Sequence, residues 1–186
     1  MDRHSPQSWF SLEEKFFANV DQALLSVLRE QGEIEQTAES IMRVTGINDP
    51  LLAAEIAKQK VSVETLSAFR LAPMVAVAWA DDRVEENERY VITQAAEKSG
   101  ISADDPAMKL LASWTEKRPP ADLLDTWCDY AKALSASLDE THRLSLRDQI
   151  LGQAKSVAEA TGGLLGFGSV SPNEKATIER IAAALS

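Results

Sequence analysis

Cysteine, histidine and aromatic residues are scarce in this chain of 186 residues, which has one cysteine, two histidines and 6% aromatic residues. Because the lone Cys128 cannot form an internal disulfide, nothing in the cysteine content indicates an oxidising compartment, and we expect a cytoplasmic protein. His4 and His142 have no cysteine or carboxylate partners at zinc-ligand spacing, which argues against a zinc site. We also expect no secretory leader and no membrane span, since the N-terminus lacks an apolar run and no window approaches about 18 consecutive apolar residues.

Positive charge is scarce as well. The chain has 19 lysines and arginines against 29 aspartates and glutamates, which gives a net charge of -10 and a pI near 4.7. This charge opposes binding to nucleic acids and to anionic membrane surfaces, and it favours cations or basic protein partners. With 45% hydrophobic residues the chain is expected to be globular, and its length suits one domain with a sizeable core.

Capped segments of helical periodicity follow one another along the chain, and no stretch alternates between apolar and polar residues. The pattern predicts an all-α fold of eight or nine helices in a single helical domain, with residues 1–61 as an N-terminal helical segment that packs on a core of residues 62–186. Ser11 is expected to cap the first helix, Gly32 to end it, and Pro73 to break a later one. The expected helices cover about 11–30, 33–45, 50–60, 62–80, 85–99, 106–117, 121–138, 140–160 and 172–185.

An acidic stretch connects two of these helices. Five carboxylates stand within eight residues at Asp81, Asp82, Glu85, Glu86 and Glu88. The three glutamates fall at a helix start, where negative charge is favourable, but the two aspartates fall at a helix C-terminus, where each costs roughly 0.3–1 kcal/mol. Arg83, Arg89, the backbone amides of the turn or a cation must therefore stabilise Asp81 and Asp82.

The helix-turn-helix unit around this stretch recurs near the C-terminus. Residues 157–160 repeat 77–80, and 170–174 repeat 84–88, so that Glu174 is equivalent to Glu88. The two aspartates have no counterparts in the second copy. Two copies are too few for an open solenoid, and they predict two similar halves packed about a pseudo-twofold axis.

Clustered carboxylates are the ligands that hard divalent cations prefer, so the acidic turn predicts a weak site for calcium, magnesium or manganese. The predicted ligands are Asp81, Asp82, Glu85, Glu88 and Glu174. Glu88 and Glu174 have an alternative role, since a carboxylate at the third helical position bonds back to its own cap in a capping box. Solvated surface charge is the alternative for the aspartates. An EF-hand is excluded, because the required glycine and final glutamate would be Glu86 and Ile92.

Two other stretches leave alternatives open. The glycine-rich segment 162–168 lacks the lysine and hydroxyl residue of a P-loop, so it predicts a tight turn whose apolar residues fold onto the core, or a docking surface. Trp114, Trp127 and Tyr130 form either part of the core or an exposed aromatic patch. The clearest helix start in the sequence is at Ser171, the predicted cap. A proline follows it, and Glu174 stands three residues after the cap.

The stretch VAWADDRVEENERYVI resembles the TerB-like domain of tellurite-resistance proteins, and VAEATGGLLGFGSVSPNEKATI resembles the second motif of that family. The likeness extends from about Ser62 to the C-terminus and includes WTEKRPPADLLDTWCDY. It implies an all-α fold of two similar halves, an acidic site with proposed metal binding, and a role in tellurite or stress response through protein contacts. No established enzymatic activity comes with it.

Carried over by position, the family motifs give Asp81 and Glu88 in the first half and Glu174 in the second. Asp82 stands where glycine is common in the family, and Thr161 stands where the second aspartate would be. The resemblance therefore implies an asymmetric acidic site.

Two functions fit these observations. The favoured one is a TerB-like binding or scaffold module with a protein partner and a divalent-cation site. The alternative is a metal-assisted hydrolase that uses the same carboxylates to activate water. An enzyme of this kind needs a concave pocket beside its acids, which distinguishes the two hypotheses.

Overall fold

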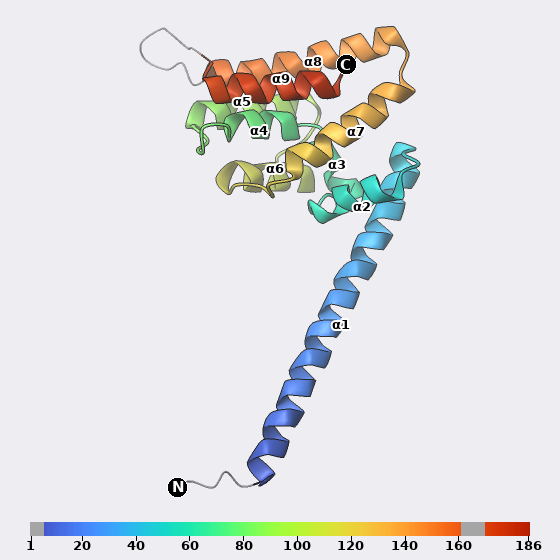
Figure 1. Cartoon of the computed structure of the whole chain (residues 1–186). Coiled ribbons are helices and arrows are strands. Elements are labelled where there is room, and N and C mark those ends of the chain that lie inside the picture. The colour runs from blue at the N-terminus through green and yellow to red at the C-terminus, as the bar shows by residue number, and fades with distance from the viewer. Residues whose placement is uncertain (1–5, 161–169) are drawn as a thin grey trace.

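The computed structural model describes residues 6–160 and 170–186, with side chains described at position 22 and from position 24 onward in those ranges. Within them the chain forms nine α-helices and one 3-10 helix and no strand, which confirms the all-α prediction (Figure 1). The predictions for segment 162–168 and Thr161 lie outside the described residues. The elements are α1 (Pro6–Thr45), α2 (Pro50–Lys58), η1 (Val63–Thr65), α3 (Leu66–Phe69), α4 (Ala72–Ala78), α5 (Glu86–Lys98), α6 (Pro106–Glu116), α7 (Leu123–Ser137), α8 (Glu140–Ala160) and α9 (Pro172–Ala184).

The first 45 residues hold one helix where the sequence predicted two. Helix α1 begins at Pro6, before the expected cap at Ser11, and it continues through Gly32. A glycine inside a helix costs only about 1 kcal/mol, which the helix-favouring flanks on both sides offset. The helix ends at Gly46, which has the left-handed φ of 74° that a helix C-terminus favours and donates its N–H to the Met42 carbonyl at 2.9 Å.

The predicted helix over residues 62–80 is divided into η1, α3 and α4. Pro73 lies in the first turn of α4, where its missing N–H costs nothing, and the break precedes it at Arg70 and Leu71. The expected break at Pro73 is therefore confirmed. Two predicted helices are joined in α1, and one predicted helix is divided into α3 and α4. The number of α-helices therefore agrees with the prediction, although the boundaries differ.

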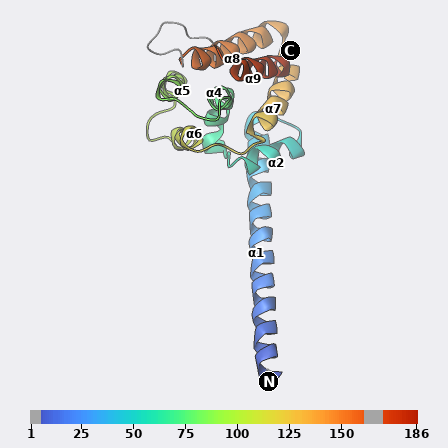
Figure 2. The same ribbon diagram turned by 60° about the vertical axis from the view of Figure 1, so that its left-hand side comes forward.

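Helix α4 is the centre of the body. It is apolar on almost all sides, as expected for a helix surrounded by others, and α5, α6, α7, α8 and α9 all pack against it. In Figures 1 and 2, α8 and α9 lie side by side over α4 and α5, while α6 and α7 lie on the opposite side of α4. Trp114 and Trp127 are only 4% and 1% exposed, which confirms their assignment to the core.

Most of α1 extends away from this body (Figures 1 and 2). Ala38 and Ile41 are buried and Ile34 is half-buried, where α1 packs against α2, which in turn packs against α7. The described side chains from position 22 to 33 are all exposed. Within the predicted segment 1–61, the packed part thus begins near Ile34.

Candidate functional site at the junction of the two repeats

Two buried glutamates occupy equivalent positions in the repeats. Glu88 and Glu174 are 2% and 3% exposed. Each carboxylate accepts a hydrogen bond from the N–H of its own cap residue, from Glu85 to Glu88 Oε2 at 2.7 Å and from Ser171 to Glu174 Oε2 at 2.6 Å. In the second repeat Ser171 Oγ also accepts from the Glu174 N–H at 3.1 Å. The capping role predicted for both glutamates is thus confirmed.

Side-chain amides connect the repeats reciprocally. Asn173, in the first turn of α9, donates from Nδ2 to Oδ1 of Asp81 at 3.0 Å, in the turn that follows α4. Asn87, in the first turn of α5, donates from Nδ2 to the carbonyl of Ala160 at 3.5 Å, at the end of α8. Each second helix is therefore bonded to the end of the other repeat's first helix. This exchange is the geometry expected of a pseudo-twofold axis between the halves.

The environment of Glu88 at this junction raises its pKa from 4.5 to about 7. Burial is the largest cause, and the hydrogen bond from the Glu85 N–H opposes it. The negative charges of Glu174, Glu85 and Asp81 raise the pKa further. Glu88 thus changes its protonation near neutral pH, and it is the carboxyl on which the charge of the acidic turn has its main effect.

Asp82 is stabilised by an arginine that local reasoning missed. Its carboxylate pairs with Arg118 Nη1 at 2.7 Å, and Arg118 also donates to the Trp79 carbonyl at 3.1 Å and lies 5.6 Å from the centre of the Trp79 ring. Arg118 follows α6 and is distant in sequence, so no spacing rule could identify it. Asp82 has a φ of 66°, a left-handed conformation that glycine adopts without strain, which gives a physical reason for glycine at such a position.

The two arginines named from the sequence have other partners. Arg83 pairs with Glu85 at 2.8 Å, and Arg89 donates from Nη2 to the Thr115 carbonyl at 3.3 Å. In the described part of the chain, neither arginine pairs with Asp81 or Asp82. Arg83 therefore neutralises the first turn of α5 and not the end of α4.

The structure consequently separates the five predicted ligands. Glu88 and Glu174 are buried at the junction with Asp81 near them at the surface, whereas Asp82 and Glu85 pair with arginines. In the described ranges, no three histidine, cysteine or acidic side chains are gathered in an arrangement that could hold a metal ion. With its pKa raised to about 7, Glu88 can bind and release a proton near neutral pH, and Glu174 adds a negative charge from the other repeat.

No family model, no curated protein and no solved structure matches the chain. A search of the helices in the described ranges found none with the length and apolar character required to cross a membrane.

Proposed function

We propose that the chain is a TerB-like binding or scaffold module of the cytoplasm, associated with tellurite or stress resistance, that holds a protein partner on α1. The observation that carries this proposal is an apolar surface on the projecting part of that helix. Leu24, Leu25, Val27 and Leu28 are between 49% and 56% exposed and adjoin one another over little more than one turn of the helix. Contiguous exposed apolar side chains of this kind mark interaction surfaces.

The charge of the same helix indicates the chemistry of the partner. Leu24, Leu28 and Glu35 lie on one helical face, because their spacings of four and seven residues return to the same side. Four exposed glutamates and two arginines stand along the described part of α1, namely Glu30, Glu33, Glu35, Glu39, Arg29 and Arg43. A second acidic copy and an anionic membrane would both be repelled. The surface therefore fits an amphipathic helix of another protein whose apolar face is flanked by lysine or arginine.

Two synthetic helical peptides with the same apolar face test this proposal, one flanked by lysines and one by glutamates. We expect fluorescence anisotropy to show binding of the lysine peptide, and Leu24→Gln with Leu28→Gln to weaken it by about tenfold without changing the charge. Leu51→Gln is the matched control, since Leu51 is 80% exposed on α2. Equal affinity for both peptides would contradict the proposal, and a dimer in light scattering that the double variant abolishes would assign the face to a second copy.

The junction of the repeats supports a second component, a site for calcium, magnesium or manganese. Glu88 and Glu174 are buried carboxyl groups from the two repeats. Burial is the main cause of the raised pKa of Glu88, and the charges of Glu174, Glu85 and Asp81 raise it further, a repulsion that a cation would relieve. We include Glu85 and Asp82 only as outer groups, because arginines pair with both.

Thermal unfolding in millimolar calcium, magnesium or manganese tests this component. A bound cation should raise Tm by mass action, more at about pH 8 than at about pH 6, because the proton on Glu88 competes with it. Glu88→Gln should abolish the increase, whereas Asp82→Asn, the control, should retain it. An unchanged Tm with all three cations would refute the site and leave the proposal for α1 intact.

The hydrolase alternative finds less support. It requires a concave pocket beside the carboxylates. The pocket lined by residues of α3, α7 and α8 includes none of the five predicted ligands. No observation at the junction supplies a substrate site, so we propose no reaction.

A further inference from the structure

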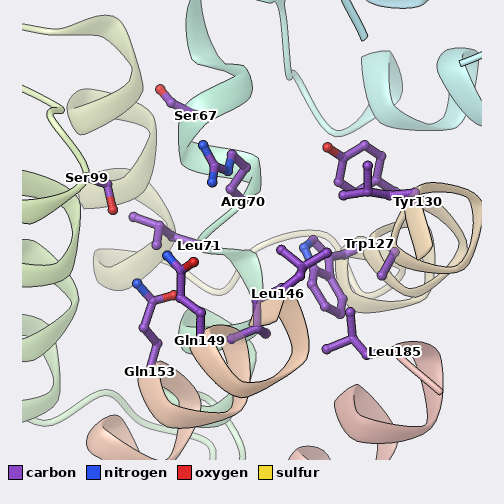
Figure 3. A pocket seen from close by; sticks show the side chains of 13 residues that line it. Ser67, Arg70, Leu71, Ser99, Trp127, Tyr130, Leu146, Gln149, Gln153 and Leu185 are labelled. Atoms are coloured by element: carbon purple, nitrogen blue, oxygen red, sulfur yellow. The ribbon is translucent and has the colours of Figure 1, made fainter. Parts of the chain in front are cut away.

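A separate pocket of about 250 Å³ opens between α3, α7, α8 and the C-terminal end of α9. Figure 3 shows its two unlike ends. Trp127, Leu146 and Leu185 lie toward one end, and Ser99, Gln149 and Gln153 lie toward the other. A pocket of this volume, at the lower limit for drug-sized ligands, accommodates only a small molecule.

The apolar end is part of the core. Leu71, Trp127, Ala131 and Leu185 line the pocket and are at most 3% exposed. The Trp127 side chain is 1% exposed, and the half-buried Leu146 of α8 also lines the pocket. Figure 3 shows these two side chains toward the same end of the pocket. This end therefore offers a wall of packed apolar side chains to a ligand.

The polar end contains one charge. Arg70 lines the pocket, and in the described part of the chain its guanidinium has no acidic partner. Gln149 and Gln153, one turn apart on α8, add side-chain amides, and Ser67 adds a hydroxyl. None of the 13 lining residues is acidic, although acidic residues outnumber basic ones by 29 to 19 in the chain. The local charge of the pocket is thus positive in an acidic protein.

These observations indicate the class of ligand. A guanidinium recognises a carboxylate through parallel hydrogen bonds, and neutral amides and hydroxyls complete its solvation. The wall of leucine, alanine and tryptophan accommodates an aliphatic chain or a ring. We propose that this pocket binds a small organic carboxylate with an apolar body, held by Arg70 at its polar end and packed against Trp127 at the other.

Isothermal titration with octanoate tests the proposal, with octanol as the neutral analogue and acetate as the analogue without an apolar body. We expect one octanoate to bind per chain, and both analogues to bind at least about tenfold more weakly, since a hydrogen bond to a charged group contributes about 1.5–3 kcal/mol. Arg70→Gln should weaken octanoate by about tenfold and leave octanol unchanged. Arg43→Gln, an exposed arginine on α1 outside the pocket, is the control and should change neither.

A second variant tests the apolar end. Leu146→Gln replaces a half-buried wall residue with a polar side chain of similar size, so folding should persist and octanoate affinity should fall. Octanoate that does not bind, or that binds Arg70→Gln as tightly as the wild type, would overturn the proposal. Octanol that binds as tightly as octanoate would overturn the assignment of a carboxylate. Because the pocket contains neither the described α1 surface nor the junction carboxylates, these outcomes are independent of the proposed function.

Discussion

The starts of α5 and α9 have the same hydrogen-bond frame and different charge. In both, a glutamate at the third helical position accepts the N–H of the cap residue, at 2.7 Å in α5 and 2.6 Å in α9. The cap of α9 is Ser171, whose hydroxyl accepts a bond in return, and Pro172 follows it. The cap of α5 is Glu85, and another glutamate follows. The hydrogen bond from the cap N–H to the glutamate is thus the same in both helices, whereas the charge of the neighbouring residues differs.

That difference affects Glu88. Burial is the main cause that raises the pKa of Glu88 to about 7, and the charges of Glu174 and of Glu85 and Asp81 from its own repeat raise it further. The second repeat has Ser171 and Pro172 where the first has Glu85 and Glu86. The same capping motif is therefore surrounded by more negative charge in the first copy, where the pKa of Glu88 is raised.

The largest expected effect comes from Glu88→Gln, which keeps an oxygen to accept the Glu85 N–H but cannot ionise. Because the folded-state pKa is raised from 4.5 to about 7, the folded state binds more protons in that interval, and the free energy of unfolding falls as pH rises through it. Relative to the variant, the wild type should lose up to about 3 kcal/mol between about pH 4.5 and about pH 7.5. Urea titrations across this range measure the difference.

Glu174→Gln is the companion variant in that experiment. It removes one of the charges that raise the pKa of Glu88, so the loss of stability should occur at lower pH than in the wild type. Parallel pH profiles for the wild type and Glu88→Gln would show that Glu88 does not titrate in this interval.

The next effect concerns the caps themselves. Ser171→Ala should cost about 0.5–2 kcal/mol, because the Glu174 N–H loses its acceptor. Glu85→Ser should convert the first cap into the second and stabilise by several tenths of a kcal/mol, after the loss of an exposed ion pair with Arg83. Denaturant midpoints at constant slope measure both changes. A loss of stability in Glu85→Ser would mean that the acidic cap contributes more than its hydrogen bonds.

The smallest effect concerns the amides that connect the repeats. Asn173→Ala removes a 3.0 Å bond to a carboxylate, whereas Asn87→Ala removes a 3.5 Å bond to a carbonyl. We expect a cost near 1 kcal/mol for the first and less for the second. A double-mutant cycle of Asn173→Ala with Asp81→Ala should give a coupling of about 0.5 kcal/mol or more. Additive losses would show that the hydrogen bond between Asn173 and Asp81 contributes nothing to stability in solution.

Local features of the fold could be predicted from the sequence. Asp49 and Asp105 cap α2 and α6, and Ser171 caps α9, because each cap depends on residues at most three positions away. The capping position of Glu88 and Glu174 could also be predicted from the sequence, whereas their burial could be predicted less directly. Helix ends were harder, since Gly32 is compatible with both a helix interior and a helix end.

Non-local features could not be predicted. The pair between Arg118 and Asp82 depends on how α6 packs beside α4, and the ring of Trp79 helps to position it. The pocket is lined by residues from several helices that are distant in sequence, so no sequence motif predicts it. Sequence periodicity identified the apolar residues of α1, but only packing shows that Ile34 is half-buried and Leu28 exposed.

Because most of α1 projects from the body, a small tilt at its packed end moves its far end over a much larger distance. From Ile34, where packing begins, to Pro6 the helix runs about 40 Å at 1.5 Å per residue. A tilt of about 10° at the packed end would move the far end by about 7 Å over that length. The packed end lies on α2, and α2 lies on α7. A small change in how α1 packs on α2 would thus produce a much larger displacement of anything bound near the far end of the helix.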